Sequence, residues 1–295
     1  MTLDEPNVLL FDKAEYAINA GAWMPEEPLL NIENILRQHI GLPRKQGSIA
    51  QPWVDPSPPV ERARISLRTT FRSQVAVAHA SLALENICES KVTFDGTPVE
   101  MHATGYYTDK AIATIALPPF EAGTHTLVIE LSFTKETSIE WFYLLGDFGV
   151  TTEGIHGLLC APVRTLSFGD WTTQGLPFYG GNVTYHCKAT ADGTAIQIPQ
   201  FKATTINVHS QGATQAIYRP PYMAAMTIKA GTPVDITLFG HRANAFGPVH
   251  LAEPGMRWLG PGSYRTGRHM FSPEYKLHPL GLLSAPIIYK SDKSA

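Results

Sequence analysis

The stretch VTFDGTPVEMHATGYYTDKAIATIALPPFEAGTHTLVIELSF, residues 92–133, decides the fold of this chain. It holds an alternating strand, a tight turn at Asp95-Gly96-Thr97, a segment that carries tyrosines, and two further strands separated by the turn Ala122-Gly123-Thr124. Alternating strands with turns every ~8–12 residues are typical of paired antiparallel sheets. The stretch therefore predicts a β-sandwich.

The same phrase recurs as INVHSQGATQAIYRPPYMAAMTIKAGTPVDITLFG, residues 206–240. Its turns are Gln211-Gly212-Ala213 and Ala230-Gly231-Thr232, and its last strand again alternates with a period of two. Two copies of one supersecondary phrase predict two sandwiches in tandem.

The composition agrees with an all-β chain of two domains. The chain has 295 residues, of which 44% are apolar, and it contains 24 glycines and 23 prolines, which favour turn-rich β structure. From residue 64 the pattern alternates, and Ile65, Leu67 and Phe71 fall on one face of a predicted strand. We expect a leader over residues 1–60, a first sandwich over 61–150 and a second over 151–295.

The leader contains a short strand and one helix. Val8–Phe11 form an apolar run, and the apolar residues between 29 and 40 fall at helical spacing, which predicts a helix near 28–40. A proline-rich connector follows over residues 51–59. A lone short helix is marginal in water and an unpaired strand seeks an edge, so we expect residues 1–50 to be an interface for a catalytic partner chain. Without such a partner, we expect the leader either to fold back on the first sandwich or to mediate self-association.

Charge and patterning exclude two classes of partner. With 23 basic and 26 acidic residues the net charge is −3, too little positive charge to hold a nucleic acid backbone. No apolar stretch reaches the roughly 18–20 residues of a membrane span. The N-terminus has early acids and no basic region before an apolar one, and Cys88, Cys160 and Cys187 are too far apart for a zinc motif, so we expect a cytoplasmic protein.

Two stretches of the second half resemble a known family. Residues 169–185, GDWTTQGLPFYGGNVTY, resemble the opening of the sugar-binding domain of family 2 glycoside hydrolases, and residues 238–250, LFGHRANAFGPVH, resemble its closing segment. Residues 10–16 and 50–54 are similar to the stretch that joins a catalytic barrel to such domains in large bacterial glycosidases, including those akin to α-L-rhamnosidases. The resemblance implies two jelly-roll, galactose-binding-like sandwiches that accompany a catalytic barrel absent from this chain.

The acidic residues do not predict a catalytic pair. Glycoside hydrolysis needs two carboxylates about 5–9 Å apart. No spacing argues for convergence among the candidates, which are Glu85, Asp109, Glu140, Asp147, Asp170, Glu253 and Glu274. The histidines at 241, 250, 269 and 278 lack the spacing of a helical zinc site, and we interpret His241 and His250 as residues whose hydrogen bonds join loops. We therefore expect no catalytic residue, metal or cofactor.

Sugar recognition needs an aromatic face and polar groups held in fixed geometry. In the two family-like motifs and the loops after them, candidate faces and candidate polar groups occur together. The predicted carbohydrate-binding residues are Trp171, Tyr179, Asn182, His241, Arg242, Asn244 and Trp258. The competing interpretation is that these residues form a framework that holds loops against the neighbouring domain.

The leading functional interpretation is a non-catalytic carbohydrate-binding or accessory module of a glycoside hydrolase, with a plant or bacterial glycan as its ligand. One alternative is a glycoside hydrolase with a reduced site between the sandwiches. Another is a protein-interaction module that docks a catalytic partner. A module without the barrel is not expected to act as an enzyme on its own.

Overall fold

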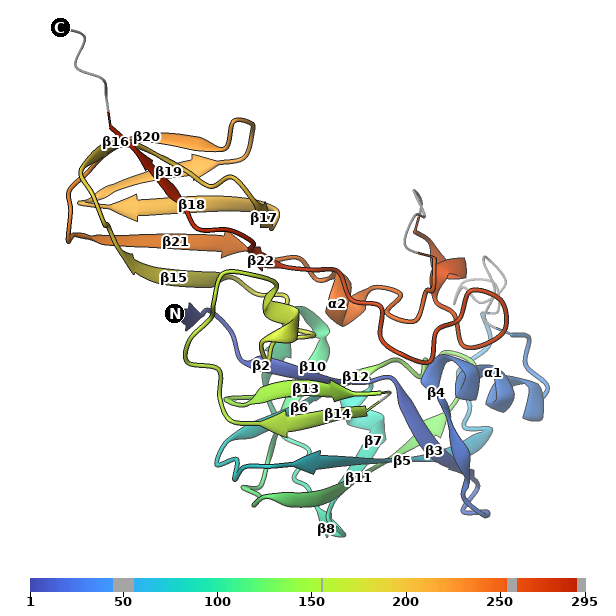
Figure 1. Ribbon diagram of the computed structural model, residues 1–295. Helices are drawn as coiled ribbons and strands as arrows, with labels where there is room; N and C mark the ends of the chain where they lie inside the picture. Colours follow the sequence, from blue (N-terminus) through green and yellow to red (C-terminus); the bar gives the residue numbers. More distant parts are fainter. Residues whose placement is uncertain (45–55, 155, 254–258, 291–295) are drawn as a thin grey trace, which may run out of the picture.

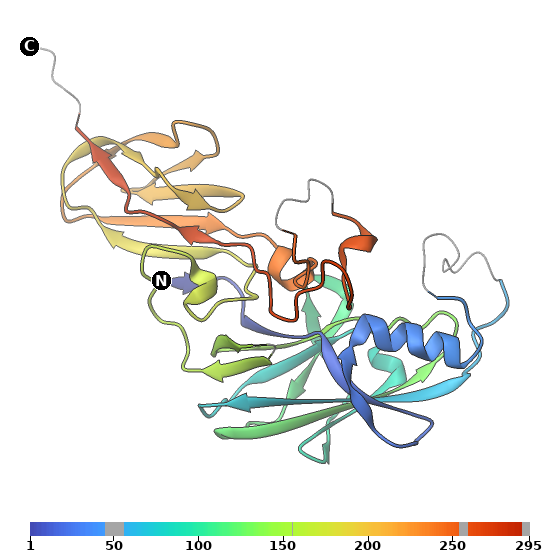
Figure 2. The same ribbon diagram turned by 45° about the vertical axis from the view of Figure 1, so that its right-hand side comes forward.

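The computed structural model describes residues 1–44, 56–154, 156–253 and 259–290 (Figure 1). Two β-sandwiches follow one another along the chain, and the N-terminus lies between them in both views (Figures 1 and 2). Within these ranges the helical elements are short: α1 (Leu29–His39), α2 (Ala243–Phe246), and the 3₁₀ turns η3 (Ile87–Glu89), η4 (Trp171–Thr173) and η5 (Pro261–Ser263). None of the described helices has the length and apolar character needed to cross a membrane. The predicted all-β sandwich class is confirmed.

The first sandwich has two facing sheets. One sheet runs in the order β2 (Asn7–Phe11), β12 (Phe142–Gly146), β6 (Ala80–Leu84), β10 (Asp109–Leu117) and β9 (Ala103–Tyr107). The other runs in the order β13 (Gly149–Glu153), β14 (His156–Cys160), β5 (Ala63–Ser73), β11 (Gly123–Phe133), β7 (Ser90–Phe94) and β8 (Thr97–Pro98), with β3 (Lys13–Ile18) paired to β5 and β4 (Met24–Pro28) paired to β3.

The period-two pattern of β5 places its apolar face in the core, as predicted. Ile65, Leu67 and Phe71 are 0%, 3% and 4% exposed, whereas Ser66, Arg68 and Thr70 on the opposite face are exposed or partly exposed. The Phe71 ring meets the Phe120 ring edge-on with centroids 5.9 Å apart, a favoured arrangement for aromatic pairs. Burial of this alternating face is what stabilises the two sheets against each other.

The second sandwich also has two facing sheets, with fewer strands in total than the first. One sheet runs in the order β1 (Thr2–Leu3), β15 (Val183–Lys188), β21 (Pro233–Phe239), β18 (Thr205–Ser210) and β19 (Ala213–Ile217). The facing sheet runs in the order β20 (Met223–Ile228), β16 (Gly193–Gln197) and β23 (Ile287–Tyr289), and a separate ladder joins β17 (Phe201–Lys202) to β22 (Gly281–Leu282). Ile206 and Ile236 of the first sheet share a core with Ile196 of the second.

The repeated phrase folds in the same way in both sandwiches. Its first and last strands pair antiparallel in one sheet, β7 with β11 in the first copy and β18 with β21 in the second. Its middle strand, β10 or β20, belongs to the facing sheet. The tight turn has φ of 49° and 78° at Asp95 and Gly96, and of 50° and 80° at Gln211 and Gly212, the left-handed pair that two-residue hairpin turns require.

The strand pairing divides the chain differently from the predicted ranges. β2 and β3, in the expected leader, are strands of the first sandwich, whereas β1 extends the second. β13 and β14 join the first sandwich although it was predicted to end at residue 150, within β13. The reason is that an apolar strand such as Val8–Phe11 stabilises the fold only when its backbone groups are paired, and β12 provides that pairing within the chain.

The predicted helix is confirmed as α1, and its apolar face is already covered. Leu29, Ile32 and Leu36 are each fully buried in the core of the first sandwich. Glu33, also buried, accepts a hydrogen bond from the Ile139 backbone N–H at 3.1 Å. Residues 45–55, with most of the predicted proline-rich connector, lie outside the described residues.

Candidate functional site

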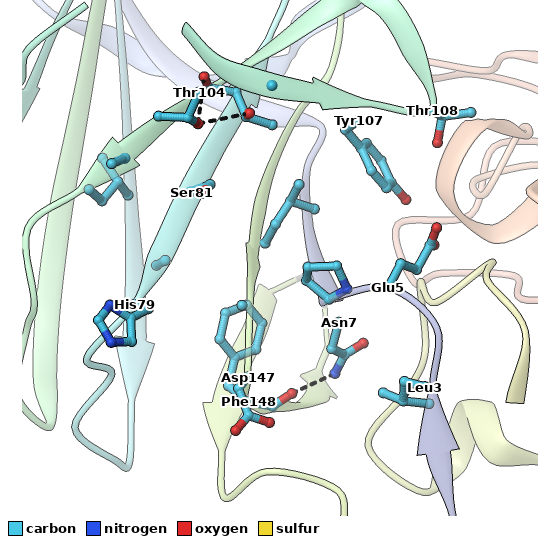
Figure 3. Close-up of a pocket in the computed structure, with 18 of the residues that line it drawn as sticks. Leu3, Glu5, Asn7, His79, Ser81, Thr104, Tyr107, Thr108, Asp147 and Phe148 are labelled. Atoms are coloured by element: carbon cyan, nitrogen blue, oxygen red, sulfur yellow. Dashed lines mark hydrogen bonds between the residues drawn. The ribbon is translucent and has the colours of Figure 1, made fainter. Parts of the chain in front are cut away.

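A cleft of about 890 Å³ opens where the first sandwich meets the N-terminal segment and the connection to the second sandwich. We call it the junction cleft. It is lined by residues 1–3, 5–7, 79–81, 104–108, 114, 116, 117, 145–148, 163 and 164 (Figure 3). Its volume lies within the range of about 300–1,000 Å³ that is usual for small-molecule sites.

Small side chains form the sheet wall of the junction cleft. Ser81 of β6 pairs with Ala116 of β10, and Gly105 of β9 pairs with Thr114. Because alternate residues of a strand face the same side, Thr114 and Ala116 border the cleft while Ile115 between them is fully buried in the core. The Thr104 hydroxyl donates to the Thr114 carbonyl oxygen at 3.1 Å. Side chains of this size leave the sheet surface open to a ligand.

Tyr107 and Glu5 line one end of the junction cleft, and Arg242 contacts both of them. The Tyr107 ring and the Glu5 carboxylate lie on the same side of it (Figure 3). The Arg242 guanidinium donates to both carboxylate oxygens of Glu5, at 2.7 Å for Oε2, and lies 5.7 Å from the centroid of the Tyr107 ring. Burial, and then the negative charge of Glu5, raise the pKa of Tyr107 to about 12, so its hydroxyl stays a hydrogen-bond donor at neutral pH.

Two buried polar atoms of cleft-lining residues have no hydrogen-bond partner in the described part of the chain. One is the Tyr107 hydroxyl and the other is Oδ1 of Asn7. The amide nitrogen of Asn7 is satisfied, since it donates to the Phe148 and Gly175 carbonyls at 2.7 and 2.9 Å. A buried polar atom without a partner costs about 1–3 kcal/mol, so a site that keeps a donor and an acceptor in this state is suited to a ligand that supplies both roles.

The two carboxylates among the cleft-lining residues are both paired with arginine. Glu5 is held by Arg242, and Asp147 accepts from Arg164 at 2.5 Å. The Asp147–Arg164 pair is open to solvent, with side chains 69% and 70% exposed. Neither acid projects unpaired into the cleft, so the pairing gives no sign of the free acid and base of a glycosidase.

The structure buries the aromatic residues predicted to face a sugar. Trp171 and Tyr179 are both 0% exposed and meet edge to face with ring centroids 6.4 Å apart. Asp170 precedes η4 and accepts from the Thr172 backbone N–H at 2.9 Å and from the Leu280 N–H at 3.1 Å, which fixes this turn against a distant loop. Burial of both rings favours the framework interpretation for these two residues.

Asn182 is part of a clamp on the N-terminal segment. Its backbone N–H and its side-chain amide donate to the two carboxylate oxygens of Asp4, each at 2.7 Å. The Tyr179 hydroxyl lies 3.0 Å from Asp4 Oδ1 and 2.9 Å from the Asn182 carbonyl. The clamp holds residues 2–4 beside β15 and so shapes one border of the junction cleft.

Among the remaining predicted residues, Arg242, His241 and Asn244 have different surroundings. Arg242 reaches the junction cleft through Glu5 as described, whereas half-buried His241 lines a different hollow in the second sandwich. Asn244 is 0% exposed and exchanges two hydrogen bonds with the His278 backbone, at 2.9 and 2.8 Å. Trp258 lies outside the described residues.

A buried hydrogen-bond network joins the first sandwich to the loop after α2. His250 Nε2 lies 2.6 Å from Asp12 Oδ2 and its Nδ1 lies 2.8 Å from the Ser272 carbonyl, and both Asp12 and His250 are under 5% exposed. Since a carbonyl only accepts, Nδ1 is the donor to Ser272, and Nε2 is within hydrogen-bond distance of Asp12. Burial, and then the charge of Asp12, raise the pKa of Tyr275, whose hydroxyl donates to Asp12 Oδ1 at 2.8 Å. The prediction that His250 joins loops is confirmed.

Sequence reasoning missed most of the junction cleft. Glu5 and Asn7 sit in the expected leader, and the Thr104–Thr108 segment was noted only as the tyrosine-bearing part of the repeat. That segment was the available signal, because exposed Tyr106, at 58%, follows a glycine in a strand, where a ligand or another backbone often approaches closely.

No family model and no curated protein matches this chain. Among solved structures, it is similar to a family 2 β-galacturonidase from Eisenbergiella tayi, at 9% identity and a TM-score of 0.29, over 82% of this chain and 37% of that one. It is also similar to a β-D-mannosidase from Dictyoglomus thermophilum, at 12% identity, a TM-score of 0.29, and 84% and 32% coverage. A rhamnosidase from Novosphingobium sp. PP1Y gives 10% identity, a TM-score of 0.27, and 92% and 24% coverage. The chain thus spans less than two fifths of the length of each, and a likeness of this size assigns neither a family nor an activity.

Proposed function

We propose that this chain is a non-catalytic carbohydrate-binding module that accompanies a glycoside hydrolase and binds a glycan in the junction cleft. The observation that carries the proposal is the composition of that cleft: a wall of small side chains, threonine and tyrosine hydroxyls, and the exposed Tyr106 on the edge strand β9 that borders it. The resemblance of residues 169–185 and 238–250 to sugar-binding domains supports the same class of ligand.

The chemistry of a sugar suits both kinds of group in the cleft. A pyranose ring has an apolar C–H face that packs on an aromatic ring, and Tyr106 offers such a ring. Each sugar hydroxyl donates and accepts a hydrogen bond, so it suits a cleft bordered by serine and threonine hydroxyls. Because the cleft is open to solvent and few ligand atoms are buried, we expect weak binding, with Kd on the order of 0.1–1 mM.

A glycan array followed by calorimetry tests the proposal. Tyr106→Ala is expected to weaken binding of the best glycan about 5- to 10-fold, the loss that one aromatic contact of about 1–1.5 kcal/mol represents. Tyr218→Ala is the matched control, since Tyr218 is also exposed, at 68%, but does not line the cleft. Equal affinity of both variants, or no glycan bound at millimolar concentration, would contradict the proposal.

A hydrolase with its site between the sandwiches is the second candidate, because Glu5 and Asp147 both line the junction cleft. The test is release of nitrophenol from a panel of nitrophenyl glycosides by the wild-type chain and by Glu5→Gln and Asp147→Asn. Under the accessory-module proposal we expect no release by any of the three. Turnover by the wild type that either substitution abolishes would replace the proposal with the catalytic alternative.

A further inference from the structure

A second hollow, of about 660 Å³, lies at one end of the second sandwich, away from the junction cleft. We call it the second hollow and define it by its lining residues, which are 199–203, 222, 241, 278, 279 and 283. The β17–β22 ladder supplies Phe201 and Lys202, β21 leads into His241, and Tyr222 immediately precedes β20. The hollow therefore gathers residues from four distant parts of the sequence.

The polar side of the second hollow is cationic and rich in donors. Lys202, His241 and His278 line it, and no carboxylate is among its lining residues, all of which the structure describes. The Ala243 backbone N–H donates to Nδ1 of His241 at 3.3 Å, so Nε2 of that ring carries the hydrogen and is free to donate. The rings of His241 and His278 are perpendicular, with centroids 6.0 Å apart.

The protein holds the side-chain donors of the second hollow in place without using them in its own hydrogen bonds. Buried Asn244 fixes the backbone of His278 with two hydrogen bonds, which holds that residue opposite His241. In the part of the chain that the structure describes, the side chains of Lys202 and His278 and the hydroxyl of Tyr222 have no hydrogen-bond partner. This arrangement is suited to an anion from outside the chain.

The other side of the second hollow is apolar. The rings of Phe201 and Tyr222 meet edge to face with centroids 5.0 Å apart, and Pro199, Pro279 and Leu283 continue this surface. An inorganic ion gains no binding free energy from contact with such an apolar surface. A sugar ring that carries a carboxylate offers an apolar face and an oxyanion together, and so matches both sides.

We propose that the second hollow binds an acidic saccharide, with the carboxylate directed to Lys202, His278 and His241 and the ring against Tyr222 and Phe201. The environment of His241 agrees with this assignment. Burial, and then the neighbouring His278, lower the pKa of His241, and an anion beside the ring would oppose that effect by favouring the imidazolium. Binding should therefore be accompanied by proton uptake. This site is separate from the junction cleft and does not depend on it.

Calorimetry of the full chain at pH 7 tests the proposal with four probes: glucuronate, glucose, acetate and inorganic phosphate. We expect glucuronate to bind at least about 5-fold more tightly than each of the other three, because only glucuronate has both the ring and the carboxylate. Titrations in buffers of different ionisation enthalpy should show net proton uptake with glucuronate. Equal affinity for glucose would show that the charge is irrelevant, equal affinity for acetate or phosphate would show that the apolar wall is irrelevant, and either result would overturn the proposal.

Single substitutions test whether glucuronate binds in the second hollow. Lys202→Gln and His278→Gln should each weaken glucuronate binding about 3- to 10-fold, the loss expected for one hydrogen bond to a charged group at a partly exposed site. Lys229→Gln and His209→Gln, exposed changes elsewhere in the second sandwich, are the matched controls and should bind as the wild type does. Lys202, Lys229 and His209 lie on strands or in a turn whose backbone hydrogen bonds do not involve the side chain. A ¹H–¹⁵N spectrum of each variant, including His278→Gln, verifies folding.

Failure of this proposal can be told apart from failure of the first. Tyr106→Ala, which tests the junction cleft, should leave glucuronate binding unchanged. Should Tyr106→Ala weaken glucuronate binding while Lys202→Gln and His278→Gln do not, the acidic sugar binds in the junction cleft and the second hollow is not its site.

Discussion

The tyrosine-bearing segment of the repeated phrase lies beside a hollow in each sandwich, but the two surroundings differ. In the first copy Tyr107 comes two residues before β10 and lines the junction cleft, and in the second copy Tyr222 comes one residue before β20 and lines the second hollow. The next strand begins after a left-handed residue in both cases, with φ of 63° at Thr108 and 57° at Tyr222.

The difference lies in what packs against each tyrosine. Tyr107 is 4% exposed, with Tyr143, Phe246 and Arg242 packed against its ring, whereas Tyr222 is only half-buried. The junction cleft has the Glu5–Arg242 ion pair at that end, whereas the charged and titratable side chains that line the second hollow are all basic. One supersecondary phrase thus repeats the position of a hollow, while the segments packed around it determine the charge and the exposure of its lining.

The largest effect is expected from breaking the buried network that joins the first sandwich to the loop after α2. His250→Ala leaves buried Asp12 with the Tyr275 hydroxyl as its remaining side-chain partner, so we expect the free energy of unfolding to fall by about 2–4 kcal/mol. Urea denaturation measures the change, and His156→Ala, at an exposed position of the first sandwich, is the control with an effect near zero. A loss below about 1 kcal/mol would mean that this network does not stabilise the junction.

A smaller effect is expected from the residue that shapes the second hollow. Asn244→Ala removes two hydrogen bonds and leaves backbone groups of His278 unpaired, which should cost about 1–3 kcal/mol. The same variant should weaken glucuronate binding, because His278 is no longer held opposite His241. Asn207→Ala, in β18 of the same sandwich, serves as the control; an Asn244 variant as stable as that control would contradict the framework role of this residue.

The equivalence of the two copies can be tested at their hairpin turns. Gly96 and Gly212 have nearly the same φ, 78° and 80°, and a Cβ at either would meet nothing within 4 Å. Alanine there is penalised by the backbone conformation alone, so Gly96→Ala and Gly212→Ala should each cost about 1–2 kcal/mol, and equally within error. Gly267→Ala, which has open space and no such φ, is the control and should be near neutral. Clearly unequal losses would show that the two turns are not equivalent.

The smallest effect expected is the pH dependence that comes from His241. Burial, and then His278, lower its pKa from 6.5, so just below that pH the unfolded chain binds more protons than the folded one. Stability from this residue is therefore present above pH 6.5 and is lost as the pH falls through the lowered pKa. Urea denaturation at pH 7.5, 6.5 and 5.5 should show a shallower decline for His241→Gln than for the wild type. Parallel declines would show that His241 does not contribute.

Much of the local structure was predictable because it depends on neighbours in the sequence. Alternation in residues 64–73 predicted the buried face of β5, the Asp95-Gly96 and Gln211-Gly212 pairs predicted the hairpin turns, and helical spacing predicted α1. Each of these signals lies within about ten residues, and the physical rule behind it is a period or a required φ.

The sites required the tertiary structure, because their contacts join residues that are far apart in the sequence. Asp4 meets Asn182, Glu5 meets Arg242 and Asp12 meets His250, and no local pattern encodes which distant partner a polar side chain finds. The same limit explains Trp171: its sequence context is that of an aromatic residue in a glycine-rich loop, which fits a ligand platform and a buried framework equally well. Only the packing of the second sandwich around it, which leaves the ring 0% exposed, decides between them.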